Sequence, residues 1–228
     1  LPNTYNAEIM IQRGYWMVSW FKKEFGQTEQ LLAAEQGVAP ETLFDELLHA
    51  VPPGSMGLIL QPYWSPGVSE PGPEAKGAII GFGDVHTRAH IYRAIIEGLT
   101  YALRAGKECM EKRSGSCIDT LRVSGGGSQS DQVMQITADV FGLPAERLHT
   151  YETSGLGAAI NGAVGVGIYS NYQEAVSHMV HKGKCFVPDA NNRVIYNQLF
   201  TDVYQKMYVR LNPLYSSIRN ITNYPRFP

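Results

Sequence analysis

The sequence is short of charge, and the charge it has is balanced. Only 18% of its 228 residues are Asp, Glu, Lys or Arg, and the formal net charge is −2. Such a chain creates no field that would gather nucleic acid or anionic lipid, so we expect neither nucleic acid nor a membrane as a partner. Because 44% of the residues are hydrophobic, a disordered tail is also excluded.

Long apolar runs and cysteine are scarce as well. No stretch of about 18 uninterrupted apolar residues could span a bilayer, and the first residues lack the order of a signal peptide. Cys109, Cys117 and Cys185 show no close metal-ligand spacing, and one thiol is left over if two pair. We therefore expect a reduced, cytoplasmic protein. Because the chain starts at Leu1 and not at Met, we also expect it to be cut from a longer protein.

Glycine, in contrast, is concentrated at one point. Residues 121–142 run from a short apolar strand through Gly125, Gly126 and Gly127 into a helix with regularly spaced apolar residues. Without Cβ atoms, such a turn lets a flat ring or a phosphate approach the backbone, and the helix N-terminus then offers unpaired amides. A plain tight turn has the same pattern, so this motif alone leaves nucleotide binding and a simple connection equally open.

Apolar periodicity predicts the other elements of the chain. Residues 8–25 begin like a strand and continue as a helix that ends at Gly26, and Pro40 opens a second, amphipathic helix. Prolines around Tyr63 and Trp64 indicate an ordered loop at 62–73. Short strands are expected at 56–61 and 118–123, and helices at 87–113, 131–141, 154–169, 173–181 and 192–217.

Residues 77–97, GAIIGFGDVHTRAHIYRAIIE, resemble the second signature of the FGGY carbohydrate kinases. Phe82 departs from the pattern, which prefers an aliphatic residue there. The positions that match are Gly77, Ile79, Gly81, His90, Ile91, Ala94, Ile95, Ile96 and Glu97. Most of these positions are periodic and apolar, so we interpret them as core and helix cap with no chemistry of their own.

Two further segments resemble the same family, and together the likeness runs from Gly14 to about Tyr208. Residues 124–130 are similar to its adenosine motif, and residues 152–167 are similar to the segment that links its two lobes. The resemblance implies an α/β fold, namely a ribonuclease H-like (actin-like ATPase) lobe with a mixed sheet flanked by helices. We expect residues 1–228 to form this single C-terminal nucleotide-binding lobe, with an N-terminal sugar-binding lobe outside the chain.

The resemblance also implies which residues contact a nucleotide. In the family, the glycines of this turn pack against adenine and ribose, which assigns that role to Gly125, Gly126 and Gly127. Ser130 falls where a polar side chain contacts the base, and Gly14 falls in a second segment of the pocket.

Neighbouring residues in the two segments have structural interpretations that we prefer. Gln129 and Asp131 favour a helix cap or a partner of the helix dipole. Trp16 and Trp20 could stack on a base, although their four-residue spacing is more typical of a core.

Catalytic residues are not expected in this chain. The resemblance implies that the general base and an Asp-Gly-Thr phosphate loop lie upstream, so ATP and Mg²⁺ are the expected cofactors, with the metal held mainly by the other lobe. Asp84 is interpreted as a turn or cap residue. His86 and His90 have helical spacing for zinc but no third ligand nearby, so we expect no metal site here.

Two functions remain as alternatives. The first is the ATP-binding C-terminal domain of a carbohydrate kinase that transfers the γ-phosphoryl group of ATP to a sugar or polyol hydroxyl, with this fragment inactive alone and a homodimer as one candidate assembly. The second is a non-catalytic actin-like module for binding or assembly, which would use exposed aromatic residues. The candidates for that surface are Tyr63, Trp64, Tyr204, Tyr208, Tyr215 and Tyr224.

Overall fold

The structure, a computed structural model, describes residues 6–67 and 71–224. Its strands are β1 (Ile59–Gln61), β2 (Ala78–Ile80), β3 (Leu121–Val123), β4 (Ala145–Leu148) and β5 (Lys182–Phe186). Its α-helices are α1 (Trp16–Phe25), α2 (Gln27–Gln36), α3 (Pro40–His49), α4 (Arg88–Ser114), α5 (Asp131–Phe141), α6 (Thr153–Gly165), α7 (Tyr172–Met179), α8 (Ala190–Leu199) and α9 (Gln205–Thr222). Shorter helical turns are η1 (Ser55–Gly57), η2 (Gly126–Gln129) and η3 (Phe200–Tyr204), of which η3 is a π-helix.

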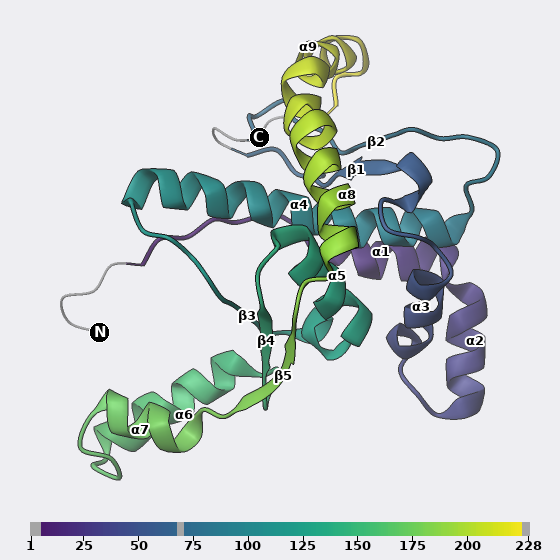
Figure 1. The fold of residues 1–228 in the computed structure, drawn as a ribbon. Helices are drawn as coiled ribbons and strands as arrows, with labels where there is room; N and C mark the ends of the chain where they lie inside the picture. The colour runs from purple at the N-terminus through teal and green to yellow at the C-terminus, as the bar shows by residue number, and fades with distance from the viewer. Residues whose placement is uncertain (1–5, 68–70, 225–228) are drawn as a thin grey trace.

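The long helix α4 is the axis of the molecule, as the sequence predicts. It crosses the body in Figure 1 and packs against α1, α3, α5 and β1. Ile95, Ile96 and Leu99 are at most 1% exposed and lie in the main hydrophobic cluster. The helix begins at Thr87, whose backbone amide donates to His90 Nδ1 at 3.1 Å, and ends at Gly115 in the left-handed conformation.

A three-stranded mixed sheet lies beside this axis. Strand β3 is parallel to β4, with Leu121 opposite Ala145, and β5 is antiparallel to β4. Helix α5 covers the sheet through Met134 and Ala138, which pack on Ala145 and Phe186. A separate antiparallel pair joins β1 and β2. This arrangement is the expected mixed sheet flanked by helices, and β3, η2 and α5 form the expected strand, glycine turn and helix.

Some expected elements differ in the structure. Residues 8–11 are not a strand, and Ile9 lies against Gly106 of α4. The expected helix at 192–217 is helical throughout but passes through η3, and α6 ends at Gly165, four residues before the expected end. Residues 68–70 of the proline-rich loop lie outside the described residues.

A buried polar network explains Glu97, the last position of the 77–97 pattern. Glu97, which is 1% exposed, accepts hydrogen bonds from Arg93 Nε at 2.7 Å and from the Tyr196 hydroxyl at 2.8 Å. Arg93 also donates to the carbonyl oxygens of Leu48 and Val51, each at 2.7 Å. The network ties α3 and α8 to α4, so this part of the pattern is structural, as expected.

The aromatic residues proposed for a docking surface are mostly not exposed. Tyr204 is 2% and Tyr215 is 4% exposed, while Tyr63 packs edge-on against Tyr208 at 5.6 Å between ring centroids. Tyr224, at 69%, is the exposed member of the set. The exposed aromatic surface that motivated a non-catalytic module is therefore mostly not present.

Across the described ranges, no helix has the length and apolar character that a membrane crossing requires.

Candidate functional site

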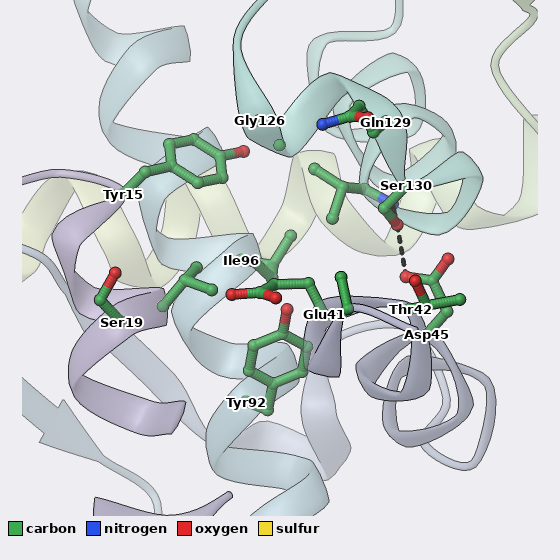
Figure 2. A pocket seen from close by; sticks show the side chains of 14 residues that line it. Tyr15, Ser19, Glu41, Thr42, Asp45, Tyr92, Ile96, Gly126, Gln129 and Ser130 are labelled. Carbon is green, nitrogen blue, oxygen red and sulfur yellow. Dashed lines mark hydrogen bonds between the residues drawn. The ribbon is translucent and has the colours of Figure 1, made fainter. Parts of the chain in front are cut away.

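A cavity of about 420 Å³ opens between α1, α3, α4 and the glycine turn η2 (Figure 2). Its walls combine apolar side chains from three helices with polar groups from α3 and from the start of α5. The lining residues that carry the argument are Tyr15, Ser19, Glu41, Asp45, Tyr92 and Ser130, with Val18, Ile96, Gly126, Gly127, Gln129 and Val133 between them. The glycine turn η2 faces this cavity.

The three glycines of the turn have different surroundings. Gly125 has φ +83° and ψ −180°, a conformation that is essentially restricted to glycine. A Cβ atom on Gly126 would meet nothing within 4 Å, whereas one on Gly127 would lie 2.7 Å from the Tyr15 ring. The turn is therefore open at Gly126 and covered by an aromatic ring at Gly127.

The expected site residues are only partly brought together at the cavity. Gly126, Gly127 and Ser130 line it, whereas Gly14 and Gly125 stand next to lining residues in the chain. Gly14 packs close to the Ile11 carbonyl oxygen, 3.2 Å from the position of its missing Cβ. Their contact with a nucleotide stays a prediction.

Tyr15 and Tyr92, and neither of the tryptophans that follow Tyr15, provide the aromatic rings at the cavity. Trp20 packs against Trp64 with ring centroids 4.5 Å apart, and Trp16 approaches Trp64 at 6.3 Å. Sequence reasoning missed Tyr15, although its place directly after Gly14 was an available signal. The ring of Tyr15 lies across from η2 in Figure 2, with its hydroxyl directed towards Gly126.

Ser130 begins α5 and links it to α3. Its Oγ accepts a hydrogen bond from the Val133 amide at 3.1 Å, which caps the helix, and its hydroxyl donates to Asp45 Oδ1 at 2.5 Å. Burial raises the pKa of Asp45, while the Ser130 hydrogen bond and the charge of His49 oppose that rise. Figure 2 shows the two side chains facing each other at the edge of the cavity.

A second carboxylate, Glu41, stands on the same side of the cavity. Glu41 Oε1 accepts a hydrogen bond from Lys22 Nζ at 2.5 Å. Burial acts to raise the pKa of Glu41, but the hydrogen bonds from Lys22 and the backbone, with the charge of Lys22, lower it overall. Glu41 and Asp45 are four residues apart and so share one face of α3. Lys22 compensates the charge of Glu41, so Asp45 makes this face negative, while the glycine turn opposite carries no charged side chain.

Tyr92 adds a hydrogen-bond donor to the floor of the cavity. It is 4% exposed, and its hydroxyl points into the space in Figure 2. Burial, reinforced by the negative charge of Asp45, raises the pKa of this hydroxyl, which therefore keeps its proton at neutral pH. The cavity thus offers a neutral phenol as well as carboxylates to a ligand.

Asp131 and Gln129 surround the helix start, as the sequence suggested for them. Asp131 pairs with Arg147 and with Lys184, whose Nζ lies 2.5 Å from Asp131 Oδ2. Arg147 also donates to the Gln129 carbonyl oxygen at 3.2 Å. The Asp131 carboxylate is therefore engaged on the β4 and β5 side of the turn, where Arg147 also holds η2 through Gln129.

Comparisons with known proteins show the family to which the chain belongs. Residues 11–166 match the FGGY family of carbohydrate kinases, C-terminal domain. The chain belongs to this family. Relatives of this FGGY chain include an uncharacterized sugar kinase, YgcE, of Escherichia coli strain K12, which is 36% identical over 86% of the chain and 40% of its own length. The xylulose kinase of Bacillus subtilis strain 168 is 30% identical over 95% of the chain and 41% of its own length.

A solved structure supports the same fold. The crystal structure of xylulose kinase from Rhodospirillum rubrum superposes with a TM-score of 0.68 at 30% identity, over 87% of the FGGY chain and 38% of that protein. The neighbours of this chain have the ribonuclease H-like, actin-like fold that the sequence implied. The chain spans about 40% of the length of the curated relatives named above.

The histidines of the FGGY signature have structural partners. His86 Nδ1 accepts a hydrogen bond from the Gly83 amide at 2.8 Å, and His90 belongs to the cap of α4. Asp84 lies in the turn before that helix. Within residues 6–67 and 71–224, no three His, Cys, Asp or Glu side chains come together in a group that could hold a metal ion.

Proposed function

We propose that this chain is the nucleotide-binding C-terminal lobe of a sugar kinase, which binds ATP and ADP in the cavity at the glycine turn. The observation that carries the proposal is the open backbone at Gly126, next to the N-terminus of α5 and facing a cavity of about 420 Å³. Membership of the FGGY family supports the reaction, which is transfer of the γ-phosphoryl group of ATP to a sugar or polyol hydroxyl.

The residues present fit a nucleotide. Val18, Ile96 and Val133 give the cavity apolar walls that suit a purine ring, while Ser130 adds a polar group at one edge. Gly126 leaves room for a ribose or phosphate to approach the backbone. The residues that would hold the nucleotide are Gly125, Gly126, Gly127, Ser130 and Gly14.

The charge distribution orients the nucleotide in this proposal. Glu41 is paired with Lys22, so Asp45 makes the α3 side negative, and it repels a triphosphate at that side. The phosphates then point away from α3 and past the uncharged glycine turn, which leaves the base beside Ser130. Bound ATP supplies the phosphoryl group, and this lobe binds and orients it.

The remaining catalytic parts are proposed for the N-terminal lobe of the full-length enzyme. They are the base that accepts the hydroxyl proton, the sugar contacts and most ligands of Mg²⁺. Closure of two lobes would exclude water from the transfer. We propose cytoplasmic action, which the three free thiols support, and the homodimer stays a prediction.

The first test is titration of Mg·ADP into the 228-residue chain, followed by isothermal calorimetry. We expect saturable binding that weakens by at least about tenfold in Gly126→Val, because the added side chain fills space that the nucleotide needs. Gly157→Val is the matched control, since a Cβ there also meets nothing within 4 Å but lies on α6, away from the cavity.

The fold of each variant is checked by circular dichroism and thermal unfolding before titration. Equal ADP affinity in the wild-type chain and Gly126→Val would remove the glycine turn from the site. A folded wild-type chain that binds no ADP would overturn the proposal that this lobe binds nucleotide.

A further inference from the structure

The hydrogen bonds of Ser130 leave its hydroxyl oxygen with one unused hydrogen-bonding position at the cavity. A serine hydroxyl has one proton to donate and two lone pairs to accept with. The proton goes to Asp45 Oδ1 at 2.5 Å, and one lone pair accepts the Val133 amide at 3.1 Å. What remains is a single lone pair, so the Ser130 hydroxyl can only accept a hydrogen bond from a ligand.

Asp45 keeps the Ser130 hydroxyl in this acceptor role towards a ligand. Glu41 is neutralised by Lys22, whereas the Asp45 carboxylate is held by the uncharged hydroxyl of Ser130. A carboxylate accepts and cannot donate when ionised, and a charge-assisted bond of this length is among the stronger ones. Rotation of the Ser130 proton towards a ligand would break that bond and leave the half-buried carboxylate without it.

We propose that Asp45 fixes the Ser130 hydroxyl as a hydrogen-bond acceptor, so that the cavity selects a purine with an amino group at position 6 over one with an oxo group. The inference rests on the proposed function, which places the base beside Ser130. An amino group donates to the free lone pair of Ser130. An oxo group at the same place sets two acceptors against each other, and a buried polar group then stays unpaired.

The test compares the affinities of ADP and inosine diphosphate for the 228-residue chain. The two nucleotides share the ribose and diphosphate, and they differ at position 6 and in the proton on the adjacent ring nitrogen. In the wild-type chain we expect ADP to bind about tenfold or more tightly, the size of one lost hydrogen bond with an unpaired acceptor.

Asp45→Ala removes the acceptor that holds the Ser130 proton, so the hydroxyl becomes free to donate to an oxo group. We expect the ratio of the two affinities to fall to within about threefold, mainly because inosine diphosphate binds more tightly. A purely structural role would weaken both nucleotides alike and leave the ratio unchanged. Glu46→Ala is the matched control, because it removes one negative charge from the exposed side of the same helix.

Asp45→Asn separates hydrogen bonding from charge. The amide oxygen can still accept the Ser130 proton, so we expect this variant to keep more of the preference for ADP than Asp45→Ala does. A wild-type chain that binds the two nucleotides equally, or an Asp45→Ala chain with the wild-type ratio, overturns the inference alone. A wild-type chain that binds neither nucleotide overturns the proposed function and this inference with it.

Discussion

At the residue scale, the consecutive glycines of η2 are not equivalent. Gly125 is required by its backbone conformation and Gly127 by the Tyr15 ring that lies on it, whereas Gly126 faces open space. The requirements at Gly125 and Gly127 come from the folded chain itself. The use of the open space at Gly126 by a ligand stays a proposal. Substitutions at the three positions should therefore separate stability from binding.

Gly125→Ala should lower the free energy of unfolding by about 1 to 3 kcal/mol, because its φ of +83° with extended ψ is strained for any residue with a Cβ. Urea denaturation followed by circular dichroism measures this loss. Gly126→Ala is the control, and it should change stability by less than about 1 kcal/mol because its Cβ enters open space. Equal losses in both variants would contradict the difference drawn here.

Single residues of the site were predictable only where a local pattern marks them. Ser130 stands between the glycine turn and an amphipathic helix, so its capping position is readable from the sequence. Asp45 lies 85 positions from Ser130 and belongs to another helix, and no local pattern signals their contact. Tyr92 follows the same apolar periodicity as the core residues of α4. The sequence therefore does not indicate that its hydroxyl points into the cavity.

At the scale of elements, a two-pronged ion pair fastens α2 to the start of α4. Arg88 Nη1 and Nη2 donate to Glu29 Oε2 and Oε1 at 2.7 and 2.6 Å. Arg88 also donates to the Phe25 carbonyl oxygen at 3.1 Å, at the end of α1. The Glu29 side chain is 8% exposed and the Arg88 side chain is 37% exposed. The carboxylate is therefore shielded from solvent, whereas the guanidinium is partly open to it. This contact ties α2 to the end of α1 and the start of α4, two helices that line the cavity.

Glu29→Gln should reduce the stability of the chain by about 1 kcal/mol at neutral pH, since it removes the charge from a bidentate pair that is partly open to solvent. The hydrogen bond from Arg88 lowers the pKa of Glu29 below its usual 4.5, although burial opposes the shift. The native state therefore binds the proton less tightly than the unfolded state. The stabilisation from the Glu29–Arg88 pair is present above pH 4.5. It is lost as the pH falls through the lowered pKa of Glu29.

Urea unfolding of the wild-type chain and Glu29→Gln, repeated from neutral pH down through the pKa of Glu29, tests this pH dependence of stability. The gap in free energy between the wild-type chain and Glu29→Gln should close as the pH falls, while Glu35→Gln, on the same helix, should show no such gap. A gap that stays constant with pH would mean that the Glu29 carboxylate is not the source of the difference.

Two helices with strong apolar patterns were predicted, whereas one helix and one strand with polar sequences were not. Helices α4 and α5 carry regular apolar faces that pack into the core, and they lie where the sequence placed them. Helix α2, QTEQLLAAEQ, has no clear apolar face, and strand β5, KGKCF, is exposed except at Phe186. Both exist because of neighbours, namely α3 and β4, that a local pattern does not contain.

At the scale of the whole molecule, α6 and α7 stand apart from the body. They extend from the end of the three-stranded sheet in Figure 1 and pack mainly on each other. Ile160 is the one buried residue of α6, and a Cβ on Gly155, Gly157 or Gly162 would meet nothing within 4 Å. Helix α4, in contrast, is held by the core along most of its length. Local stability should therefore differ sharply between the two regions.

Hydrogen exchange measured by mass spectrometry should show this difference directly. We expect peptides from α6 and α7 to exchange well before peptides from the central turns of α4, because few apolar contacts oppose local opening there. Peptides from α5, which is buried on the same sheet, serve as the internal reference. Exchange of α6 at the rate of α4 would show that the two helices are held by contacts with the body.

The tryptophans give the molecule an optical property. Trp16, Trp20 and Trp64 are its only indoles, and their rings lie within one cluster. Two of them are on α1, whose residues Val18 and Ser19 line the cavity. Light emitted by the indoles therefore comes from one place, on the helix that forms a cavity wall. The protein carries a built-in, unlabelled reporter of that helix, read by fluorescence alone.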